Sequence, residues 1–221
     1  MPLDSDVANL LHSGVWIVEV LDALVTAELE ASPDAVLARF QRVAEMIETY
    51  GLAGVGAPHL RHLAGSLWEV PLGGRGRAGY TVPIHVVARR RRVVAVRALM
   101  KAGRNAQRGE VALALARGKG GDMIRKRARV GELHKKWRKT RFGYAKALAE
   151  LASEFRLAAQ MIEARTRAGL TQDRLAERMK TKRTVIARLE AGRTKPSTRT
   201  LEKLAAATGH RLKISFEPDG G

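Results

Sequence analysis

The chain has 221 residues, enough for two small domains, and its 40 basic against 22 acidic side chains give a formal net charge of +18. It has no cysteine, which excludes disulfides and thiolate zinc sites and fits a reducing cytoplasm. No apolar run reaches the roughly 18 residues of a membrane span, and the N-terminal residues have no signal-peptide pattern. We therefore expect a cytoplasmic protein that does not bind membranes and whose first candidate partner is nucleic acid.

Seven elements are predicted before residue 118, in the order β-α-α-β-β-β-α. They are a strand over 15–20, helices over 22–30 and 33–51, strands over 66–70, 77–87 and 93–100, and a helix over 107–117. Ser32 and Pro33 are the start signal of the second helix, and Gly51 is its stop signal. This order favours an α+β fold in which two helices cover one face of a mostly antiparallel sheet.

Three short segments of this half are WIVEV at 16–20, HLAGSLWEV at 62–70 and GRGR…Y at 74–80, the last followed by a basic hairpin and a short helix. In this order and spacing they make residues 16–118 resemble the RelE-like toxins, in particular the HigB type. The resemblance implies a small ribonuclease that cuts messenger RNA in the ribosomal A site. Such enzymes use the 2′-hydroxyl of the RNA itself, with protein donors for the developing charge and a proton carrier.

The resemblance also indicates which residues would carry this chemistry. By position the best matches are Arg77, Tyr80, Arg97 and Lys101, with His62 as a proton carrier. Each has a structural alternative, because the arginines could be solvated strand residues, Tyr80 a core residue and His62 a surface residue. The segment LMKAGRNAQ keeps Lys101 and Arg104 where the family often has paired lysines and a Thr-Pro step, and Pro71 stands where related toxins have a basic or polar residue. A weakened or inactive toxin is therefore an open alternative. No cofactor and no metal are expected.

Residues 119–141 form a basic junction after the toxin-like half. The wider segment 121–146 holds 10 basic and 2 acidic residues. Two interpretations stay open, a solvated linker and a direct contact with DNA or RNA.

Residues 157–209 are predicted to form a compact helical bundle. Caps and stops divide them into four helices, one ending at 168, one over 172–179, one from 181 or 182 to 191, and one over 198–208. In the third helix Val185, Ile186 and Leu189 are expected on the inner face. The outer face and its surroundings carry the residues expected to bind DNA, namely Gln172, Thr181, Lys182, Arg183, Thr184, Arg188 and Lys195.

The segments AGLTQDRLAERM and TVIARLEAGRTKPS make residues 162–209 resemble the phage-repressor type of helix-turn-helix domain. The resemblance implies a buried ion pair between Arg165 and Glu190. This sequence differs from the family pattern at one position, since Lys180 stands in the turn where the family usually has glycine. A non-glycine residue in a left-handed conformation costs roughly 1 kcal/mol.

The tail over 210–218 (HRLKISFEP) alternates apolar and polar residues and is predicted to be a strand. Because a lone strand needs a partner, we expect it to pair with a second copy or with an edge of the N-terminal sheet, and we expect a homodimer.

The two resemblances occur in the order of a HigB–HigA locus, toxin first and antitoxin second. Trp137, Phe142, Tyr144 and Glu154-Phe155 match the segment that leads into the antitoxin helices. The predicted domains are therefore a toxin domain over 1–118, the basic junction over 119–141 and an antitoxin domain over 142–221. The expected partners are operator DNA, and the ribosome and messenger RNA through the toxin domain. Two rivals stay open, a transcriptional regulator with an inactive toxin-like module and an RNA-binding protein without cleavage.

Overall fold

The computed structural model describes residues 15–73, 79–101, 109, 112–117, 127–192 and 194–216. Contacts within the chain divide it into two compact units, residues 1–155 and residues 156–221. The division falls inside helix α7 (Ala152–Arg167), whereas the sequence placed the start of the second domain at residue 142. The difference arises because residues 128–155 pack on the first unit.

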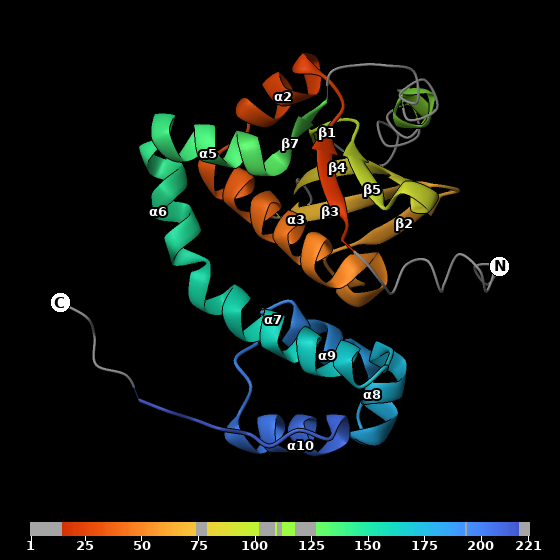
Figure 1. Ribbon diagram of the computed structural model, residues 1–221, viewed down its shortest axis with the longest axis vertical. Helices are drawn as coiled ribbons and strands as arrows, with labels where there is room; N and C mark the ends of the chain where they lie inside the picture. Colours follow the sequence, from red (N-terminus) through yellow and green to blue (C-terminus); the bar gives the residue numbers. More distant parts are fainter. Residues whose placement is uncertain are drawn as a thin grey trace. The chain divides into compact units, whose positions relative to one another are not determined.

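A mixed β-sheet forms the centre of the first unit (Figure 1). The described strands are β1 (Ile17–Val20), β2 (Arg61–Ala64), β3 (Leu67–Gly73), β4 (Gly79–Val87), β5 (Arg92–Ala95), β6 (Leu99–Lys101) and β7 (Ala128–Arg129). Their order is β2-β3-β4-β5-β1-β7, with β6 paired to β4, and a short 3-10 helix η1 (Ala88–Arg90) joins β4 to β5. Strand β1 runs parallel to β5, and the other strand pairs described are antiparallel. The α+β class is therefore confirmed.

Two of these strands, β2 and β7, were not predicted, and one predicted strand is divided. Strand β2 begins with the exposed residues Arg61 and His62, so it lacks the alternation by which a half-buried strand is recognised. The predicted strand over 93–100 is divided into β5 and β6, because residues 97 and 98 leave the ladder after Val96 N donates to Pro83 O. Strand β7 lies in the basic junction and pairs with the free edge of β1, a contact that no local pattern could indicate.

Helix α3 (Asp34–Val55) covers one face of the sheet, and it contacts β1 and β3. Residues paired between strands share a face and alternate along each strand. The centre of the covered face is apolar and at most 1% exposed, through Val18, Val20, Val70, Val82, Ile84, Val93 and Ala95. Helix α3 continues past the predicted stop at Gly51, which has φ 70° and breaks the helical geometry there.

The opposite face of the sheet carries two buried carboxylates that are neutralised by arginine. Glu69 is 2% exposed, accepts a hydrogen bond from Thr81 Oγ1 at 3.1 Å and pairs with Arg61. Glu19 is 4% exposed and pairs with Arg92, while its other oxygen lies 3.5 Å from Nη1 of Arg127. Buried carboxylates need such partners, because an unpaired buried charge is costly.

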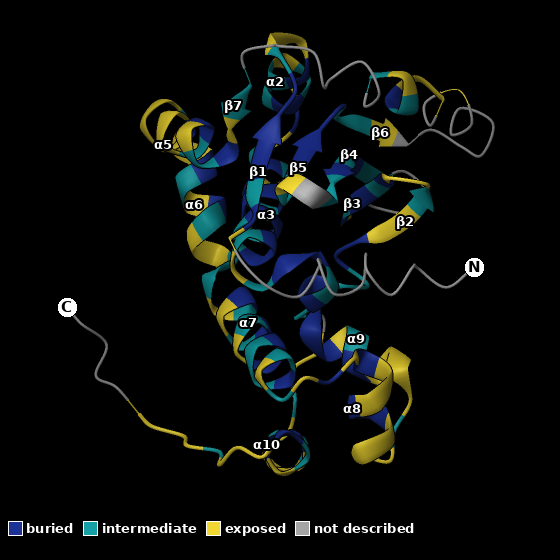
Figure 2. Ribbon diagram, turned by 45° about the vertical axis from the view of Figure 1, so that its right-hand side comes forward, coloured by how far each residue is buried: buried dark blue, intermediate teal, exposed yellow. Residues whose placement is uncertain are grey.

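Helices α5 (Val130–Thr140) and α6 (Phe142–Glu150) pack against α3 and form part of the first unit (Figure 1). Trp137 and Tyr144 are fully buried, and their rings meet edge to face with centroids 5.7 Å apart. A Cβ atom at Gly143 would collide with the carboxylate of Asp34, so glycine permits the close approach of α6 to the start of α3. Figure 2 shows that the exposed residues of α5 and α6 lie on their outer sides.

Polar contacts fix α5 and α6 to helix α2 (Ala23–Glu30) and to the start of α3. Glu30 Oε1 accepts hydrogen bonds from Trp137 Nε1 at 3.0 Å and from Lys136 Nζ at 2.9 Å, and these bonds lower the pKa of Glu30. Arg141 donates to Asp34 Oδ1 at 2.6 Å and to the backbone oxygens of Glu30 and Ser32 at 2.6 and 3.3 Å. One guanidinium group thus satisfies carbonyl groups at the end of α2 that the helix itself leaves open.

The second unit contains the helices α8 (Gln172–Arg178), α9 (Arg183–Glu190) and α10 (Thr198–Thr208), which follow α7. These helices match the predicted segments. Within the described residues 210–216 the predicted terminal strand is not formed, and residues 217 and 218 of that prediction lie outside the described part of the chain. Ile214 is 58% exposed and Phe216 fully exposed, so the alternating pattern of the tail is present without a partner to bury it.

His134 makes the stability of the first unit depend on pH. Its Nδ1 atom lies 2.7 Å from the hydroxyl of Tyr144, and burial lowers the pKa of His134. A lowered histidine pKa contributes stability that is present above the unfolded value of about 6.5 and is lost as the pH falls through the folded value. We expect the free energy of unfolding of this unit to fall as the pH decreases below about 6.5.

The measurement is urea unfolding followed by tryptophan fluorescence, since all three tryptophans, Trp16, Trp68 and Trp137, belong to the first unit. A His134→Gln variant, which cannot titrate, should lose part of this pH dependence. An unchanged dependence in that variant would show that other groups cause it.

Candidate nucleic-acid interface

Helices α8 and α9 are joined by a tight turn that is fixed by backbone hydrogen bonds. Thr171 caps α8 by accepting a hydrogen bond from Arg174 N at 3.2 Å. After α8, Lys180 adopts φ 50°, and Thr181 N donates to Ala176 O at 2.9 Å. The left-handed residue therefore occurs at Lys180, where glycine would carry no steric cost.

A small apolar core orients α9. Ile186 and Leu189 are 0% and 3% exposed, and they share this core with Leu175 and Leu204. Val185 was predicted on the inner face, and this prediction was wrong, since its side chain is 40% exposed. The reason is geometric, because Ile186, Leu189 and Glu190 define a narrow buried stripe and Val185 lies at its margin.

A buried ion pair links α9 to α7. Arg165 donates from Nε to Glu190 Oε1 at 2.6 Å and from Nη2 to Oε2 at 3.0 Å, and the two residues are 2% and 0% exposed. Arg165 also donates to the carbonyl oxygen of Leu170 at 3.0 Å. This is the pair that the sequence resemblance implied, in the two-bond geometry that arginine and carboxylate favour.

Gln172 belongs to the same buried network. Its side chain is 7% exposed, and Nε2 donates to Glu190 Oε2 at 2.8 Å. The sequence placed Gln172 among the DNA-binding residues. The structure instead directs its side-chain amide into the domain, where it completes the hydrogen bonds of Glu190.

The outer face of α9 is polar and exposed. Thr184 and Arg188 are one helical turn apart and lie opposite the buried stripe. Arg183 is exposed and its Nε lies 3.5 Å from Asp173 Oδ2 of α8, a surface pair of the kind that contributes little energy. Of the other predicted DNA contacts, Lys182 and Lys195 are exposed and Thr181 is half-buried.

Comparison with known families assigns this part of the chain. The helix-turn-helix family model matches residues 161–211. This segment is a helix-turn-helix domain. The match confirms the phage-repressor-type resemblance and supports DNA-binding regulator activity in the C-terminal part of the chain. No curated protein and no solved structure matches the chain.

The chemistry of the helix-turn-helix domain suits a major groove. An α-helix fits that groove, and side chains near its N-terminus reach the base edges. Arginine can donate two hydrogen bonds to guanine O6 and N7, and the methyl groups of threonine and valine can contact the thymine methyl. Val185 therefore joins Thr184 and Arg188 as a base-contact candidate that the sequence pattern assigned to the core.

The residues predicted for toxin chemistry are not brought together where the structure describes them. His62 pairs with Trp68, and Tyr80 alternates with Thr81, so both lie on the face covered by α3 but at positions far apart along β3. The backbone of Lys101 pairs with Gly79 at the end of β6. Arg77 lies outside the described residues.

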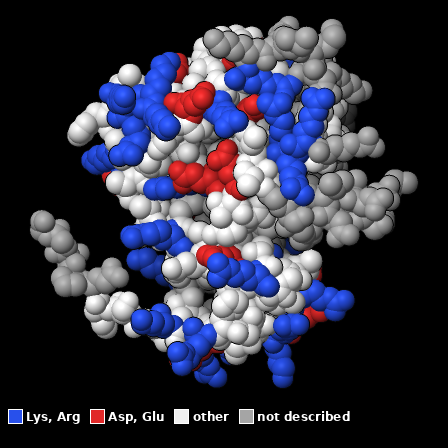
Figure 3. Space-filling view, in the orientation of Figure 1, with Lys and Arg blue, Asp and Glu red and all other residues white. Residues whose placement is uncertain are grey.

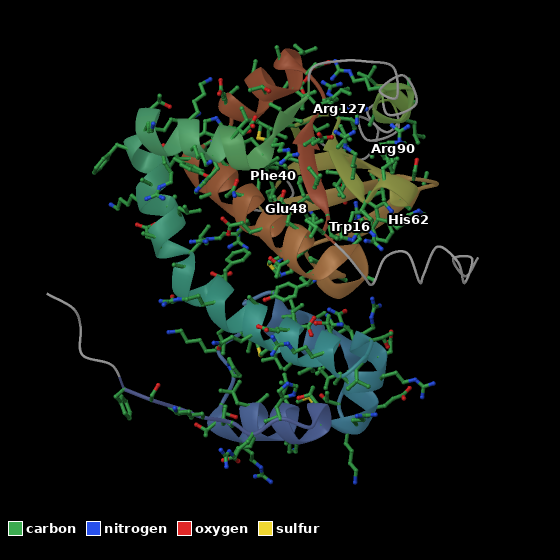
Figure 4. The ribbon with its side chains drawn as sticks, in the orientation of Figure 1. Trp16, Phe40, Glu48, His62, Arg90 and Arg127 are labelled. Atoms are coloured by element: carbon green, nitrogen blue, oxygen red, sulfur yellow. The ribbon has the colours of Figure 1, made fainter. Side chains whose placement is uncertain are left out.

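Two of these residues have other contacts. His62 Nε2 lies 2.8 Å from the carbonyl oxygen of Gly65 and donates to it, and its ring meets Trp68 edge to face at 5.0 Å. Arg97 Nε lies 3.6 Å from Glu28 of α2. Figure 4 places His62 at the β2 side of the sheet, away from Arg127 at the β7 side.

The sequence did not indicate the arginine–glutamate pairs on the sheet face opposite α3. Glu19 and Glu69 alternate with apolar residues in their strands, and only the register places Arg61 and Arg92 beside them. Among the described residues, no group of three or more His, Asp or Glu side chains is placed to hold a metal ion. No described helix is long and apolar enough to cross a membrane.

The buried ion pair generates a prediction about the stability of the second unit. Replacing Glu190 with alanine leaves the Arg165 guanidinium buried without its carboxylate, which costs about 3–5 kcal/mol. We expect Glu190→Ala to unfold the helix-turn-helix domain or to lower its urea midpoint strongly, as measured by circular dichroism. The tryptophan-fluorescence transition of the first unit should stay unchanged.

Glu163→Ala is the matched control for this variant. Glu163 forms an exposed pair with Arg167 on the surface of α7, and such pairs contribute up to about 1 kcal/mol. Equal effects of the two substitutions would show that burial does not determine the strength of the Arg165–Glu190 contact.

Proposed function

We propose that the chain is a natural toxin–antitoxin fusion of the HigB–HigA type. Its C-terminal domain binds operator DNA as an autorepressor, and it neutralises in cis a RelE-like, ribosome-dependent messenger RNA endoribonuclease domain. The helix-turn-helix match over residues 161–211 supports the DNA-binding half. The resemblance of residues 16–118 and the α+β architecture of the first unit support the toxin-like half.

The observation that carries neutralisation in cis is the position of residues 142–155. The resemblance assigns these residues to the antitoxin, yet they pack on the first unit. Arg42 Nη2 donates to Leu148 O at 3.1 Å, and Arg39 contacts Glu154 at 3.4 Å and lies over the ring of Phe155. An antitoxin segment bound to the toxin-like helices by apolar and ionic contacts is what inhibition within one chain requires. The tether keeps this segment at an effective concentration near millimolar.

A second candidate is a transcriptional regulator whose toxin-like unit is inactive and serves dimerisation or sensing. The contact of Arg97 with Glu28 and the hydrogen bond of His62 to Gly65 favour it, since both side chains already have partners. The distance along β3 between the positions paired with His62 and Tyr80 favours it as well.

The exposed tail supports the proposal that the protein is a homodimer in the cytoplasm. Ile214 and Phe216 present apolar surface next to unpaired extended backbone, which a second copy of the tail could cover. A monomer mass by light scattering at micromolar concentration would contradict this pairing.

DNA recognition by α9 is tested by single substitutions. We expect Arg183→Ala and Arg188→Ala each to weaken binding to a selected operator by about 1–3 kcal/mol and to relax its sequence preference, because each can remove a two-bond contact to guanine. The measurement is selection from a random duplex pool followed by anisotropy titration. Arg167→Ala, outside α8 and α9, is the control, and an equal loss in that variant would mean that α9 is not the reading helix.

Toxicity is tested by inducing residues 1–118, the full chain and the fragment with Lys101→Ala in separate cultures. The fusion proposal expects growth arrest from the fragment, relief by Lys101→Ala and no arrest by the full chain. Arrest by the full chain as strong as that by the fragment would contradict neutralisation in cis. A soluble, folded and harmless fragment would favour the regulator with an inactive toxin-like unit.

A further inference from the structure

Helix α5 carries a row of basic side chains on its exposed side. Lys135, Arg138 and Lys139 are exposed and are spaced three and four residues apart, so they share one helix face. The opposite face is buried through Val130, Leu133 and Trp137. Figure 3 shows lysine and arginine gathered over this helix.

These three cations differ from several arginines of the first unit. Arg42, Arg61, Arg92 and Arg141, among others, have carboxylate partners within the unit. Within the part of the chain that the structure describes, Lys135, Arg138 and Lys139 have no ion-pair partner, and the neighbouring Lys136 already contacts Glu30. The charge of this face is therefore available to an external anion.

The stability of the helix explains the row only in part. Basic residues in the last turn favour the helix dipole, which accounts for Arg138 and Lys139, and Glu132, three residues before Lys135, offsets part of the charge of that lysine. Like charges three and four residues apart destabilise a helix by a few tenths of a kcal/mol per pair. A bound polyanion would remove that repulsion.

Among polyanions, the surface fits duplex DNA best. An anionic membrane would need an apolar face beside the charges, but the apolar face of α5 is buried in the unit. Single-stranded RNA would bind by base stacking as well as by charge, and the ring it could stack on is Phe142, which is 89% exposed at the start of α6. The Phe142→Ala variant below tests this alternative. Duplex DNA needs only cations facing phosphates, and a duplex bound by the helix-turn-helix domain of the same chain is present at high effective concentration through the covalent connection.

We propose that Lys135, Arg138 and Lys139 of α5 bind the phosphate backbone of the duplex that the helix-turn-helix domain occupies. This inference rests on DNA binding by that domain and adds a second contact without sequence preference. The first unit then contributes phosphate contacts of its own. The contact strengthens and lengthens the footprint, and it carries the salt dependence expected of phosphate contacts.

The test is anisotropy titration of the full chain with a mixed-sequence duplex of about 40 base pairs, from 50 to 200 mM salt. The variant is Lys135→Gln/Arg138→Gln/Lys139→Gln. The control is Lys146→Gln/Arg156→Gln/Lys203→Gln, which removes the same charge from three separated, exposed positions. Losing three phosphate contacts should reduce the slope of log K against log salt by about 2.7. The intact chain should thus lose about 40-fold more affinity than the variant over this salt range.

The outcomes separate this inference from the proposed function. The expected result is a smaller slope for the α5 variant and a near-parental slope for the control. Equal slopes in the two variants overturn the inference. Binding to single-stranded RNA and to phosphatidylserine vesicles is measured beside the duplex, and a loss of binding confined to either of them also overturns it. Loss of all duplex binding in Thr184→Ala/Arg188→Ala, with the α5 variant unchanged, supports the helix-turn-helix assignment and overturns the α5 contact.

Two further measurements keep the result interpretable. Because the three side chains are exposed, the circular-dichroism spectrum and thermal midpoint of the α5 variant should match those of the parent. If the triple variant does not fold, Lys135→Gln alone should reduce the slope by about 0.9, and no reduction overturns the inference. Phe142→Ala should leave duplex binding unchanged, whereas a loss there would indicate base stacking in place of phosphate contact.

Discussion

The side chain of Arg141 determines which part of the chain belongs to the first unit. It lies between α5 and α6 and reaches the end of α2 and the start of α3, where it binds two backbone oxygens and the Asp34 carboxylate. Glu30 completes the contact by accepting from Trp137 and Lys136. Because these donors and acceptors are more than 100 residues apart in sequence, they close the first unit around α3. The segment that a resemblance alone would give to the next domain is thereby part of this one.

The second unit depends on a buried polar network of similar design. Glu190 accepts from Arg165 and Gln172, and these bonds fix the rotation of α9 about its axis. With Ile186 and Leu189 turned inward, Thr184 and Arg188 must face outward. The orientation of the side chains offered to DNA is therefore set by a carboxylate on the reverse side of the same helix.

Local signals explain which parts of the structure could be predicted. The caps at Thr171 and Ser197 and the glycine stops lie within a few residues of the helices they delimit, so the bundle from α7 to α10 followed from the sequence. Strand β7 and the packing of α5 depend on partners such as Glu19 and Glu30, which are distant in sequence. One error was local but subtle, because Val185 lies one position outside the buried stripe. The buried partner of the Gln172 side chain could not be read from the sequence either, since Glu190 is 18 residues away.

Docking of α5 and α6 on the first unit also determines what a single break in the chain can do. Strand β7, α5 and α6 follow residue 126 and remain held by β1, α2 and α3 through backbone pairing, a buried tryptophan and ion pairs. A protease that cuts between residues 117 and 127 would therefore leave two fragments that stay associated. The two fragments would separate only on denaturation, or when another molecule competes for the α3 surface. They would behave in this respect like the two subunits of a complex. The contacts of β7, α5 and α6 with the rest of the first unit therefore do not depend on an intact chain.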